Sequence, residues 1–595
     1  MMEGMMNNNE ILEGKFPLAY IKSLPAQQLA DVAQRMRSAM VESLLESGGH
    51  FSSNLGTIEL TLALHYVFNS PRDKFLFDVG HQCYAHKIIT GRGEAFASIR
   101  QFGGLSGFTR PQESEHDILS SGHASVSLSV AAGMVAGQAL EMRKQERVLA
   151  IIGDAGLSGG IAFEALNHIG AMGLPVIVIL NDNQMSIAPG CGALHEHLAI
   201  LEDRNFFTTL GFEYWGDYDG HDCALMVDLF TKAKAVQRPL LIHLKTQKGK
   251  GYPAAEIDPI AYHGITGKGQ AKASAPSYTQ IFSEALVGLA QKHEDVVAIT
   301  AAMPSGTGVD KLEKLMPQRC YDVGIAEQHA VAFASGLALA GKRVVVALYA
   351  TFLQRAVDQV IHDVVMQRLP MIITLDRAGV VAGDGESHQG VYDIALLQSL
   401  PNLIFLAPAS GEELKLMLSW ASEQSTLVVI RYAKAEIPDA QLKIPLEPLV
   451  LGVGVFWHRV EDAAILLVSL GSLAIEVERA IEYLGERNIA VDHCHARFIK
   501  PLNVEYWQSL LAKYSLVVTL EEAVVDGGWG VQLASLMSMA QERPRFLHLG
   551  VESSLLPHGS RDDLLRFCQL DGTSIAQRVA SYYQYLDDKS SADVV

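Results

Sequence analysis

Short apolar runs alternate with helix-like stretches along the chain, most plainly between residues 147 and 187. Val148–Ile152 and Val176–Leu180 are two such runs, rich in branched aliphatic residues and bounded by polar or glycine residues. Runs of this kind are typical of parallel strands that are buried on both faces of a sheet. Ala162–Ile169 lies between them and has the apolar spacing of a helix, so the sequence predicts a βαβ unit here.

The same alternation recurs down the chain and predicts an α/β protein of three successive domains with mainly parallel sheets. We expect the domains to span residues 1–272, 277–435 and 446–595. A stretch rich in Gly, Ala, Ser and Lys at 264–278 is the clearest linker, and a proline-containing connector at 433–448 precedes the third domain. The third domain has no cluster of ionisable residues that suggests chemistry, which favours a role in packing and dimerisation.

The two strands of the predicted βαβ unit end on oxygen-bearing side chains. Asp154 follows the first strand and Asn183 follows the second. Ligands of parallel α/β sheets bind at the carboxyl ends of the strands, and carboxylate and amide oxygens suit a hard divalent cation that also holds a diphosphate. An ordinary Gly-Asp turn and an ordinary Asn turn explain these two residues equally well.

Several histidines and a lysine also follow the ends of predicted elements in the first domain. A predicted helix stops at a Gly-Gly pair just before His50, for which a solvated helix end is the simpler explanation. His81 follows a predicted strand. Gly122 and His123 precede a helix of small residues, whose free N–H groups can meet phosphate oxygens. A basic, glycine-spaced turn at Lys248 is as easily a solvated turn as a diphosphate contact.

In the second domain, charged residues stand beside apolar segments. Glu327 opens a helix of Ala, Val, Phe and Leu, so its carboxyl group should have a raised pKa or a specific proton partner; complementing the helix dipole is the plainer alternative. Arg377 and Arg431 each end an apolar strand, where an unpaired guanidinium is unfavourable, and we expect each to bind a phosphate or carboxylate group. Phe352 follows a strand, where core packing is the simpler explanation.

Composition and charge limit the function classes. The chain has 595 residues, of which 49% are hydrophobic and 19% charged, as in a globular protein with a large core. Its net charge of −19 argues against nucleic-acid binding through phosphate neutralisation. The six cysteines form no CxxC pair and no signal peptide is recognisable, so we expect the reducing cytoplasm. No apolar run approaches the roughly 20 residues of a membrane span.

The chain resembles the thiamine-diphosphate enzymes of the transketolase group from about Leu12 to its C-terminus. The segments that carry the resemblance include SGGHFSSNLGTIEL, FDVGHQCYAHKI, AFEALNH, ILNDNQMSI, YDVGIAEQHAVAFASG, YATFLQRAVDQV and GESHQG. A Gly-Asp pair with an asparagine 29 residues after the aspartate is common to such enzymes. The segments around His50 and Phe352 are more specific, and they are most similar to the 1-deoxy-D-xylulose-5-phosphate synthase family.

The resemblance implies how the chain would bind its cofactor. Asp154, Asn183 and the carbonyl of Met185 would bind Mg²⁺, which carries the diphosphate of thiamine diphosphate. Further cofactor-lining positions would be His81, Gly122, His123, Ala124, Ala155, Gly156, Lys248 and Tyr252. Ile187 would support the bent cofactor, Phe352 would stack on its aminopyrimidine, and Glu327 would hydrogen-bond the pyrimidine nitrogen.

The resemblance also implies the substrate site. His50, His263, Asp384 and His388 would surround the reacting carbon. The residues that would bind substrate, including the phosphorylated acceptor, are His50, Tyr349, Arg355, Arg377, Ser387, His388 and Arg431. A histidine would supply the proton to the new alkoxide.

The activity implied by the resemblance is decarboxylation of pyruvate and condensation with D-glyceraldehyde 3-phosphate to give 1-deoxy-D-xylulose 5-phosphate and CO₂. This reaction opens the non-mevalonate isoprenoid pathway and feeds thiamine and pyridoxal biosynthesis. The resemblance further implies three doubly wound domains of transketolase type and a homodimer, with no nucleic acid or membrane partner.

The chain departs from the family pattern in four places. Ala155 stands where glycine is usual, Ala124 where serine is usual and Gln184 where glutamate is common. The connector 197–212 is far shorter than the usual insertion. If position 155 required a positive φ, alanine would cost roughly 1 kcal/mol, which the fold tolerates.

Two other functions are compatible with the same motifs. One is transketolase-like transfer of a ketol group between sugar phosphates, without loss of CO₂. The other is a non-catalytic paralogue that acts as a scaffold. The presence of Glu327, Asp154, Asn183, His50 and His388 argues against the scaffold.

Overall fold

The computed structural model describes residues 9–13, 18–140, 146–187, 189–200, 205–268, 275–438, 444–540, 543–552 and 555–592. It divides into two compact units, one of Met1–Ala271 with Gly324–Ala326 and the other of Lys272–Val323 with Glu327–Val595. The predicted linker at 264–278 and the short connector at 197–212 fall partly outside the described residues.

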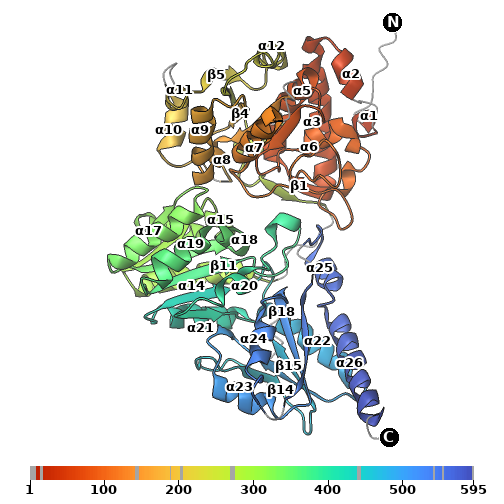
Figure 1. Ribbon diagram of the computed structural model, residues 1–595, viewed down its shortest axis with the longest axis vertical. Coiled ribbons are helices and arrows are strands. Elements are labelled where there is room, and N and C mark those ends of the chain that lie inside the picture. Colours follow the sequence, from red (N-terminus) through yellow and green to blue (C-terminus); the bar gives the residue numbers. More distant parts are fainter. Residues whose placement is uncertain are drawn as a thin grey trace. The chain divides into compact units, whose positions relative to one another are not determined.

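The first unit is built on a five-stranded sheet in which every strand is parallel to its neighbours (Figure 1). In their order across the sheet the strands are β2 (Lys74–Phe77), β3 (Val148–Gly153), β4 (Ile177–Asp182), β6 (Leu240–Lys245) and β5 (Glu213–Asp219). The predicted βαβ unit is confirmed, because β3 and β4 are adjacent and α9 (Gly160–Met172) connects them.

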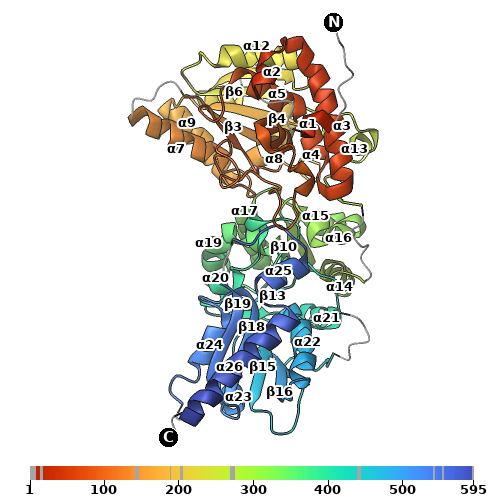
Figure 2. The same ribbon diagram turned by 90° about the vertical axis from the view of Figure 1, so that its right-hand side faces the viewer.

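Helices cover both faces of this sheet (Figure 2). They include α5 (Ile58–Val67) and α12 (Cys223–Ala233) on one face, and α7 (Ser127–Leu140), α9 and α11 (Phe206–Thr209) on the other. Val148, Ala150 and Ile152 of β3 pack against α7 and α9, whereas Leu149 and Ile151 pack against α5 and α12. Burial on both faces explains why this strand is apolar at every position rather than at every second one.

A two-stranded ribbon positions His50. The helix α3 (Leu29–Ser47) ends at the Gly-Gly pair, as predicted, but Gly48–His50 then form β1, which pairs antiparallel with β7 (Gly264–Thr266). His50 is therefore part of a strand, and the solvated helix end that seemed the simpler explanation is wrong. Gly48 has a φ of 79° and lies against the backbone of residues 265–267, so only glycine fits this crossing.

The second unit contains two sheets. The seven-stranded sheet has the order β17 (Phe498–Lys500), β12 (Leu403–Leu406), β13 (Leu427–Arg431), β11 (Met371–Asp376), β10 (Arg343–Tyr349), β8 (Val296–Thr300) and β9 (Cys320–Asp322). The five-stranded sheet has the order β14 (Val455–His458), β16 (Val491–His495), β15 (Ile465–Ser469), β18 (Leu516–Val524) and β19 (Arg545–Val551). All pairings are parallel except β12 with β17 and β14 with β16, so the predicted α/β class with mainly parallel sheets is confirmed.

The helices of the second unit lie between these strands in the sequence. The longer ones are α14 (Tyr278–Lys292), α17 (Glu327–Leu339), α21 (Gly411–Ala421), α22 (Ala474–Gly485), α23 (Val504–Leu511) and α26 (Gly572–Ala592). Shorter ones include α16 (Asp310–Leu315), α18 (Ala350–Leu353), α20 (Asp393–Leu397), α24 (Trp529–Ser535) and α25 (Arg561–Phe567).

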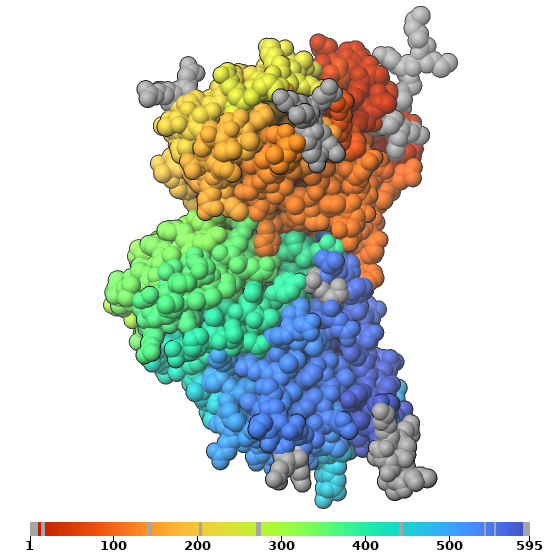
Figure 3. Space-filling model, in the orientation of Figure 1, coloured from red at the N-terminus to blue at the C-terminus, as the bar shows by residue number. Residues whose placement is uncertain are grey.

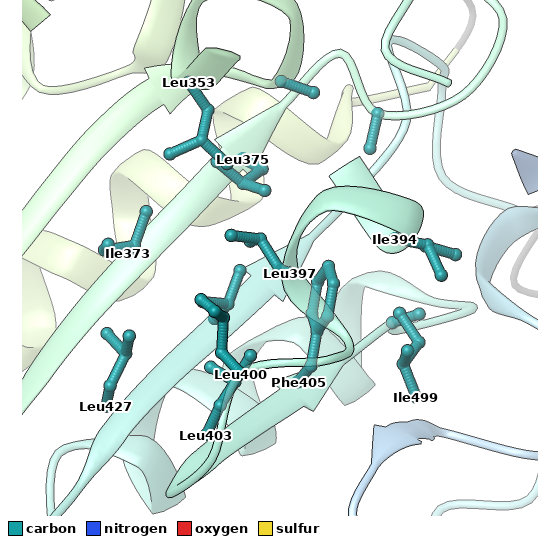
Figure 4. Close-up of a cluster of buried hydrophobic side chains, with 14 of the residues drawn as sticks. Leu353, Ile373, Leu375, Ile394, Leu397, Leu400, Leu403, Phe405, Leu427 and Ile499 are labelled. Carbon is teal, nitrogen blue, oxygen red and sulfur yellow. The ribbon is translucent and has the colours of Figure 1, made fainter. Parts of the chain in front are cut away.

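The edge strand β17 joins the two sheets of the second unit. It comes from the part of the chain that builds the five-stranded sheet, yet it pairs with β12 of the seven-stranded sheet. Ile499 belongs to the same apolar cluster as Ile394 and Phe405 (Figure 4), and the cluster continues through Leu466 into the five-stranded sheet. The two parts present a continuous surface in Figure 3. Residues 277–435 and the C-terminal third are therefore packed as one body.

Candidate active site

The predicted metal-binding residues lie at neighbouring strand ends in the first unit. Asp154 begins the short helix α8 (Asp154–Leu157) directly after β3, and Asn183 directly follows β4. Asp154 is 5% exposed, and its Oδ1 accepts no hydrogen bond from the described residues. Burial and the nearby Asp182 raise the pKa of Asp154 to about 7. A buried oxygen that lacks a donor is what a metal-binding carboxylate looks like without its cation, so the residues fit Mg²⁺.

The chain after β4 folds into a tight turn around Asn183. Asn183 Oδ1 accepts the Met185 N–H at 3.0 Å, and Lys248 Nζ donates to the Ser186 carbonyl at 2.6 Å. Lys248 is 5% exposed, and burial, opposed by Asp154, lowers its pKa to about 8. A cavity of about 230 Å³ lies between residues 182–185 and 245–248. Because Lys248 is buried beside this cavity, it does not form the solvated turn considered as the alternative, and its charge is suited to a diphosphate.

This turn is supported by a chain of contacts that runs from Asp182 through His243 to Tyr214. Asp182 Oδ1 accepts the Gln184 N–H at 3.1 Å, and its Oδ2 lies 2.8 Å from His243 Nε2. The Tyr214 hydroxyl lies 2.9 Å from His243 Nδ1. None of the three was predicted, although Asp182 belongs to the same strand end as Asn183 and strand-end reasoning could have found it.

Three predicted histidines meet in the first unit. The ring centroids of His50, His81 and His263 are 5.4–6.0 Å apart. The ribbon of β1 and β7 brings His263 to His50, because His50 pairs in register with Gly264, the residue that follows His263. Asn54 Nδ2 donates to the carbonyls of both His50 and His81 at 2.8 Å. Local sequence could not reveal a cluster that depends on pairing across more than 200 residues.

The long glycine-rich loop before α7 packs against this cluster. Phe108 contacts the His50 ring, with centroids 5.2 Å apart. Asp117 holds the loop: it accepts the Arg110 N–H at 2.8 Å, both terminal nitrogens of Arg92 at 2.7–2.8 Å, and lies 3.0 Å from His86 Nε2. Burial opposes the charge of Asp117, but His86 and Arg92 outweigh it and lower the pKa.

Glu327 is the first residue of α17 in the second unit. It is 3% exposed, and its Oε2 accepts no hydrogen bond from the described residues. Arg355 Nη1 lies 3.8 Å from that oxygen. Burial raises the pKa of Glu327 in spite of Arg355, in the direction expected for a carboxyl group among apolar neighbours.

The predicted aromatic and basic residues of the second unit gather around Phe352. Its ring stacks on Tyr349 at 5.6 Å and meets His388 edge-on at 5.6 Å. The Arg377 guanidinium lies 3.8 Å from the centre of the Tyr349 ring. Arg377 Nη1 donates to Asp376 Oδ1 and to the Gly306 carbonyl, both at 2.8 Å.

Arg431 is placed differently from Arg377. It is 4% exposed and binds Asp393 with two nitrogens, Nε at 2.7 Å and Nη2 at 3.2 Å, and Nη2 also donates to the Glu522 carbonyl at 3.0 Å. The carboxylate partner expected for Arg431 is Asp393, so the depth of Arg431 does not by itself require a substrate phosphate. Arg377 also has a carboxylate partner, but all of its hydrogen bonds within the described residues come from Nη1.

The predicted residues Asp384, Ser387 and His388 share a loop that runs from Gly379 to Gly390. Asp384 Oδ2 accepts a hydrogen bond from Lys434 Nζ at 2.8 Å. Ser387 Oγ lies 3.0 Å from His388 Nδ1, and Thr351 Oγ1 donates to the Ser387 carbonyl at 2.9 Å. The structure thus brings together Tyr349, Phe352, Arg377 and His388 with this loop in the second unit.

Family profiles and relatives identify the chain's family. The profile of 1-deoxy-D-xylulose-5-phosphate synthase matches residues 17–206 and 199–246. The profiles of the transketolase pyrimidine-binding and C-terminal domains match 274–439 and 457–575. The 1-deoxy-D-xylulose-5-phosphate synthase of Thermomicrobium roseum is 41% identical over 608 residues, covering 94% of this chain and 96% of the relative. The chain belongs to this family.

Other relatives agree with this assignment. The 1-deoxy-D-xylulose-5-phosphate synthases of Treponema pallidum (strain Nichols) and Thiobacillus denitrificans are 41% and 39% identical over 606 residues and cover 94% of the chain. A transketolase structure from Campylobacter jejuni is 17% identical over 93% of this chain and 99% of its own, with a TM-score of 0.46, too distant a likeness to add to the argument. No helix among the described residues is long and apolar enough to cross a membrane.

The departure at position 155 leaves the backbone unstrained, whereas Gln184 has a positive φ of 60°. Ala155 is not among the residues with positive φ, so alanine is compatible with its conformation. Ala124 is buried, and the neighbouring Ser125 donates its hydroxyl to the Gly156 carbonyl at 2.6 Å. Asp78, at the end of β2, accepts the Ser125 N–H at 2.6 Å and thereby fixes the chain that enters α7. Asp78 and Ser125 were not predicted.

Proposed function

We propose that the chain joins pyruvate to D-glyceraldehyde 3-phosphate, releasing CO₂ and forming 1-deoxy-D-xylulose 5-phosphate. The observation that carries the proposal is a pair of buried carboxylates, Asp154 and Glu327, each with an oxygen that accepts no hydrogen bond from the described residues. In a chain of this family, Asp154 would bind the cation that carries the diphosphate, and Glu327 would hydrogen-bond the pyrimidine nitrogen.

Asp154, Asn183 and the Met185 carbonyl would hold Mg²⁺, and Lys248 would contact the diphosphate. The support for Mg²⁺ is the oxygen-only set of ligands at two adjacent strand ends. When bound, thiamine diphosphate supplies an electron sink for the loss of CO₂ from pyruvate. Gly122, His123, Ala124, Ala155 and Gly156 would line the diphosphate, since they belong to chain segments that approach each other through Ser125.

The remaining polar residues would handle protons. The raised pKa of Glu327 favours its protonated form, which can donate a hydrogen bond to a pyrimidine nitrogen. His50, His81 and His263 in the first unit, and His388 in the second, would hold the substrate oxygens or move protons at their ring nitrogens. Asp384, which accepts a hydrogen bond from Lys434, would orient a donor on the substrate.

Arg377 would bind the phosphate of the acceptor. Its guanidinium is held over Tyr349, so the fork is oriented before the substrate arrives. Planar nitrogen pairs suit phosphate oxygens. Tyr349, Arg355 and Ser387 would complete the acceptor site. Arg431 would instead act as a structural ion pair.

We further propose a homodimer in the cytoplasm. In α7 and α17, small and apolar residues recur at helical spacing on the exposed side: Gly133, Gly137 and Leu140 in one, Ala332, Gly336 and Leu339 in the other. Leu140 and Leu339 are 89% and 72% exposed. A helix that is apolar all round is normally covered, and a second copy of the chain is the occupant expected for this family. The six cysteines are unpaired, which favours a reducing compartment.

The direct test of the activity is release of CO₂ from labelled pyruvate with and without glyceraldehyde 3-phosphate, in the presence of Mg²⁺ and thiamine diphosphate. We expect CO₂ release together with 1-deoxy-D-xylulose 5-phosphate. Transfer of a ketol group from a sugar phosphate without CO₂ would contradict the proposal and show a transketolase.

A further inference from the structure

The loop Gly379–Gly390, which carries Asp384, Ser387 and His388, is anchored by residues of the C-terminal third of the chain. Its two ends form a backbone bridge, with Gly379 N–H donating to the Gly390 carbonyl at 2.8 Å and the reverse bond at 2.9 Å. Val380 and Val391, which lie at these ends, are fully buried in an apolar cluster whose other members come from residues 465–580. The loop is therefore rooted in the core of the five-stranded sheet.

A buried ion pair fastens the first residues of this loop. Glu522 Oε2 accepts the Val380 N–H at 3.2 Å and lies in contact with Gly379. Arg561 binds Glu522 with both terminal nitrogens, and its Nη1 also donates to the Val380 carbonyl at 3.4 Å. Ser472 Oγ donates to Glu522 Oε1 at 2.9 Å. Glu522 and Arg561 thus bind both the backbone N–H and the backbone carbonyl of Val380.

Further contacts fix the middle and the end of the loop. Gly383 N–H donates to the Gly559 carbonyl at 2.9 Å, and Val524 N–H donates to the Val391 carbonyl at 3.0 Å. Gly385 lies against the His558 imidazole so closely that a Cβ would collide with it. From inside the loop, Gln389 Nε2 donates to the Gly385 carbonyl at 2.9 Å and its Oε1 accepts the Val381 N–H at 2.7 Å. These contacts hold the loop in one backbone conformation, and most of them come from the C-terminal third of the chain.

We propose that Glu522 and Arg561 are positioning residues for His388: they fix the 379–390 backbone from the C-terminal domain and thereby set where the imidazole stands. This inference rests on the proposed function for the role of His388, and it gives the third domain a part in catalysis. A displacement of about 1 Å in a reacting group can lower a rate about a hundredfold. A small movement of the loop backbone should therefore lower the rate of the reaction measurably.

The test compares Glu522→Gln with a matched control in the full-length protein. Glu413 is also a buried glutamate paired with an arginine, Arg497 Nε at 2.7 Å, but it has no contact with the loop among the described hydrogen bonds. Glu413→Gln therefore makes the same chemical change elsewhere in the unit. Hydrogen exchange of peptides covering 379–390 should accelerate at least about tenfold in Glu522→Gln and remain unchanged in Glu413→Gln. Arg561→Lys provides a milder second variant in case Glu522→Gln fails to fold.

The kinetic measurement is a double-mutant cycle with His388→Ala. We expect Glu522→Gln to lower kcat about tenfold to a hundredfold in the wild-type background and less than about twofold in the His388→Ala background. Equal losses in both backgrounds, or unchanged exchange in the loop, would overturn the positioning role. If the wild-type chain itself made no product from pyruvate and glyceraldehyde 3-phosphate, the proposed function would fail, while the exchange measurement would still decide the anchoring.

Discussion

Glu521 and Glu522 are consecutive buried residues of β18 whose carboxyl groups have opposite pKa shifts. Glu521 accepts the backbone N–H groups of Trp529 and Gly530 at 2.8 and 2.9 Å. Burial dominates there and raises its pKa to about 7. Burial also opposes the charge of Glu522, but Arg561 outweighs it and lowers the pKa. The partner, and not the depth, decides the charge state.

This contrast predicts opposite pH dependences for two variants. The folded form of the wild type holds the Glu521 proton to a higher pH than the unfolded chain does. The resulting stability is fully present below the unfolded pKa of 4.5 and is lost as the pH rises to about 7. Glu521→Gln should therefore gain about 3 kcal/mol relative to wild type between pH 4.5 and 7.5. Urea unfolding at several pH values measures this difference.

Glu522→Gln is the matched control for that measurement. The lowered pKa of Glu522 contributes stability that is fully present above the unfolded pKa of 4.5 and is lost as the pH falls through the folded pKa. This variant should therefore lose stability relative to wild type as the pH rises to 4.5, with a constant difference above that pH. If the difference in unfolding free energy from wild type changed with pH in the same way for both variants, the assigned charge states would be wrong.

The two strand-end arginines should separate in kinetic assays. Arg377→Ala should raise the KM for glyceraldehyde 3-phosphate by about one to two decades, on about 1.5–3 kcal/mol per charged hydrogen bond, and leave the KM for pyruvate nearly unchanged. Arg431→Ala leaves Asp393 buried without its partner and should instead lower the free energy of unfolding by about 3–5 kcal/mol. A selective KM effect in Arg431→Ala alone would reverse these assignments.

Asp154→Ala should abolish metal-dependent binding of thiamine diphosphate in a folded protein. Loss of a ligand should weaken affinity at least about 100-fold, since even residues behind metal ligands account for factors of 10–100. Calorimetry with and without excess chelator measures this effect, and Asp228→Ala at the surface is the control. If the wild type bound thiamine diphosphate equally well with and without excess chelator, no cation would be involved.

At the scale of elements, the ribbon of β1 and β7 shows which features the sequence could not reveal. The strands β3 and β4 were predictable because each is a continuous apolar run, and their ends supplied Asp154 and Asn183. The strand of His50 was not predictable, because it is three residues long and pairs with residues 264–266, and His50 itself entered the candidate site only through the resemblance to a known family. The partner of Arg431 was hidden for the same reason: Asp393 lies 38 residues away in a different element. Local patterns carry no information about such pairings.

The loop that carries Phe108 is held by two carboxylates, Asp117 and Glu113, of which Asp117 makes more of the hydrogen bonds. Asp117→Asn would remove the nearer of the two carboxylates beside Arg92, Asp117 at 2.7 Å, and leave only Glu113 at 3.6 Å, so we expect a loss of about 3–5 kcal/mol in the free energy of unfolding and faster proteolysis between residues 100 and 121. Asp228→Asn breaks only an exposed pair and should change stability by less than about 1 kcal/mol. Unchanged cleavage in Asp117→Asn would mean that other contacts hold the loop.

At the scale of the whole molecule, the exposed apolar sides of α7 and α17 predict association of two chains. Light scattering should give twice the chain mass of 64.6 kDa. Leu339→Glu places a charge on the apolar side of α17 and should shift the protein toward the monomer. Leu315, at the end of α16, is similarly exposed at 62%, and Leu315→Glu should leave the mass unchanged. A dimer that survives Leu339→Glu would place the contact on another surface.

The strand β17 limits where the gene can be divided. A fragment that stops before residue 444 would lack β17, and β12 would then present an unpaired, apolar edge to solvent. Exposed edges of this kind recruit strands from other molecules, so the truncated polypeptide should be prone to aggregation. The complementary fragment would expose Ile499 and its apolar neighbours, because the seven-stranded sheet that buries them would be missing. Recombinant halves of this enzyme should therefore be produced together, so that each completes the other during folding.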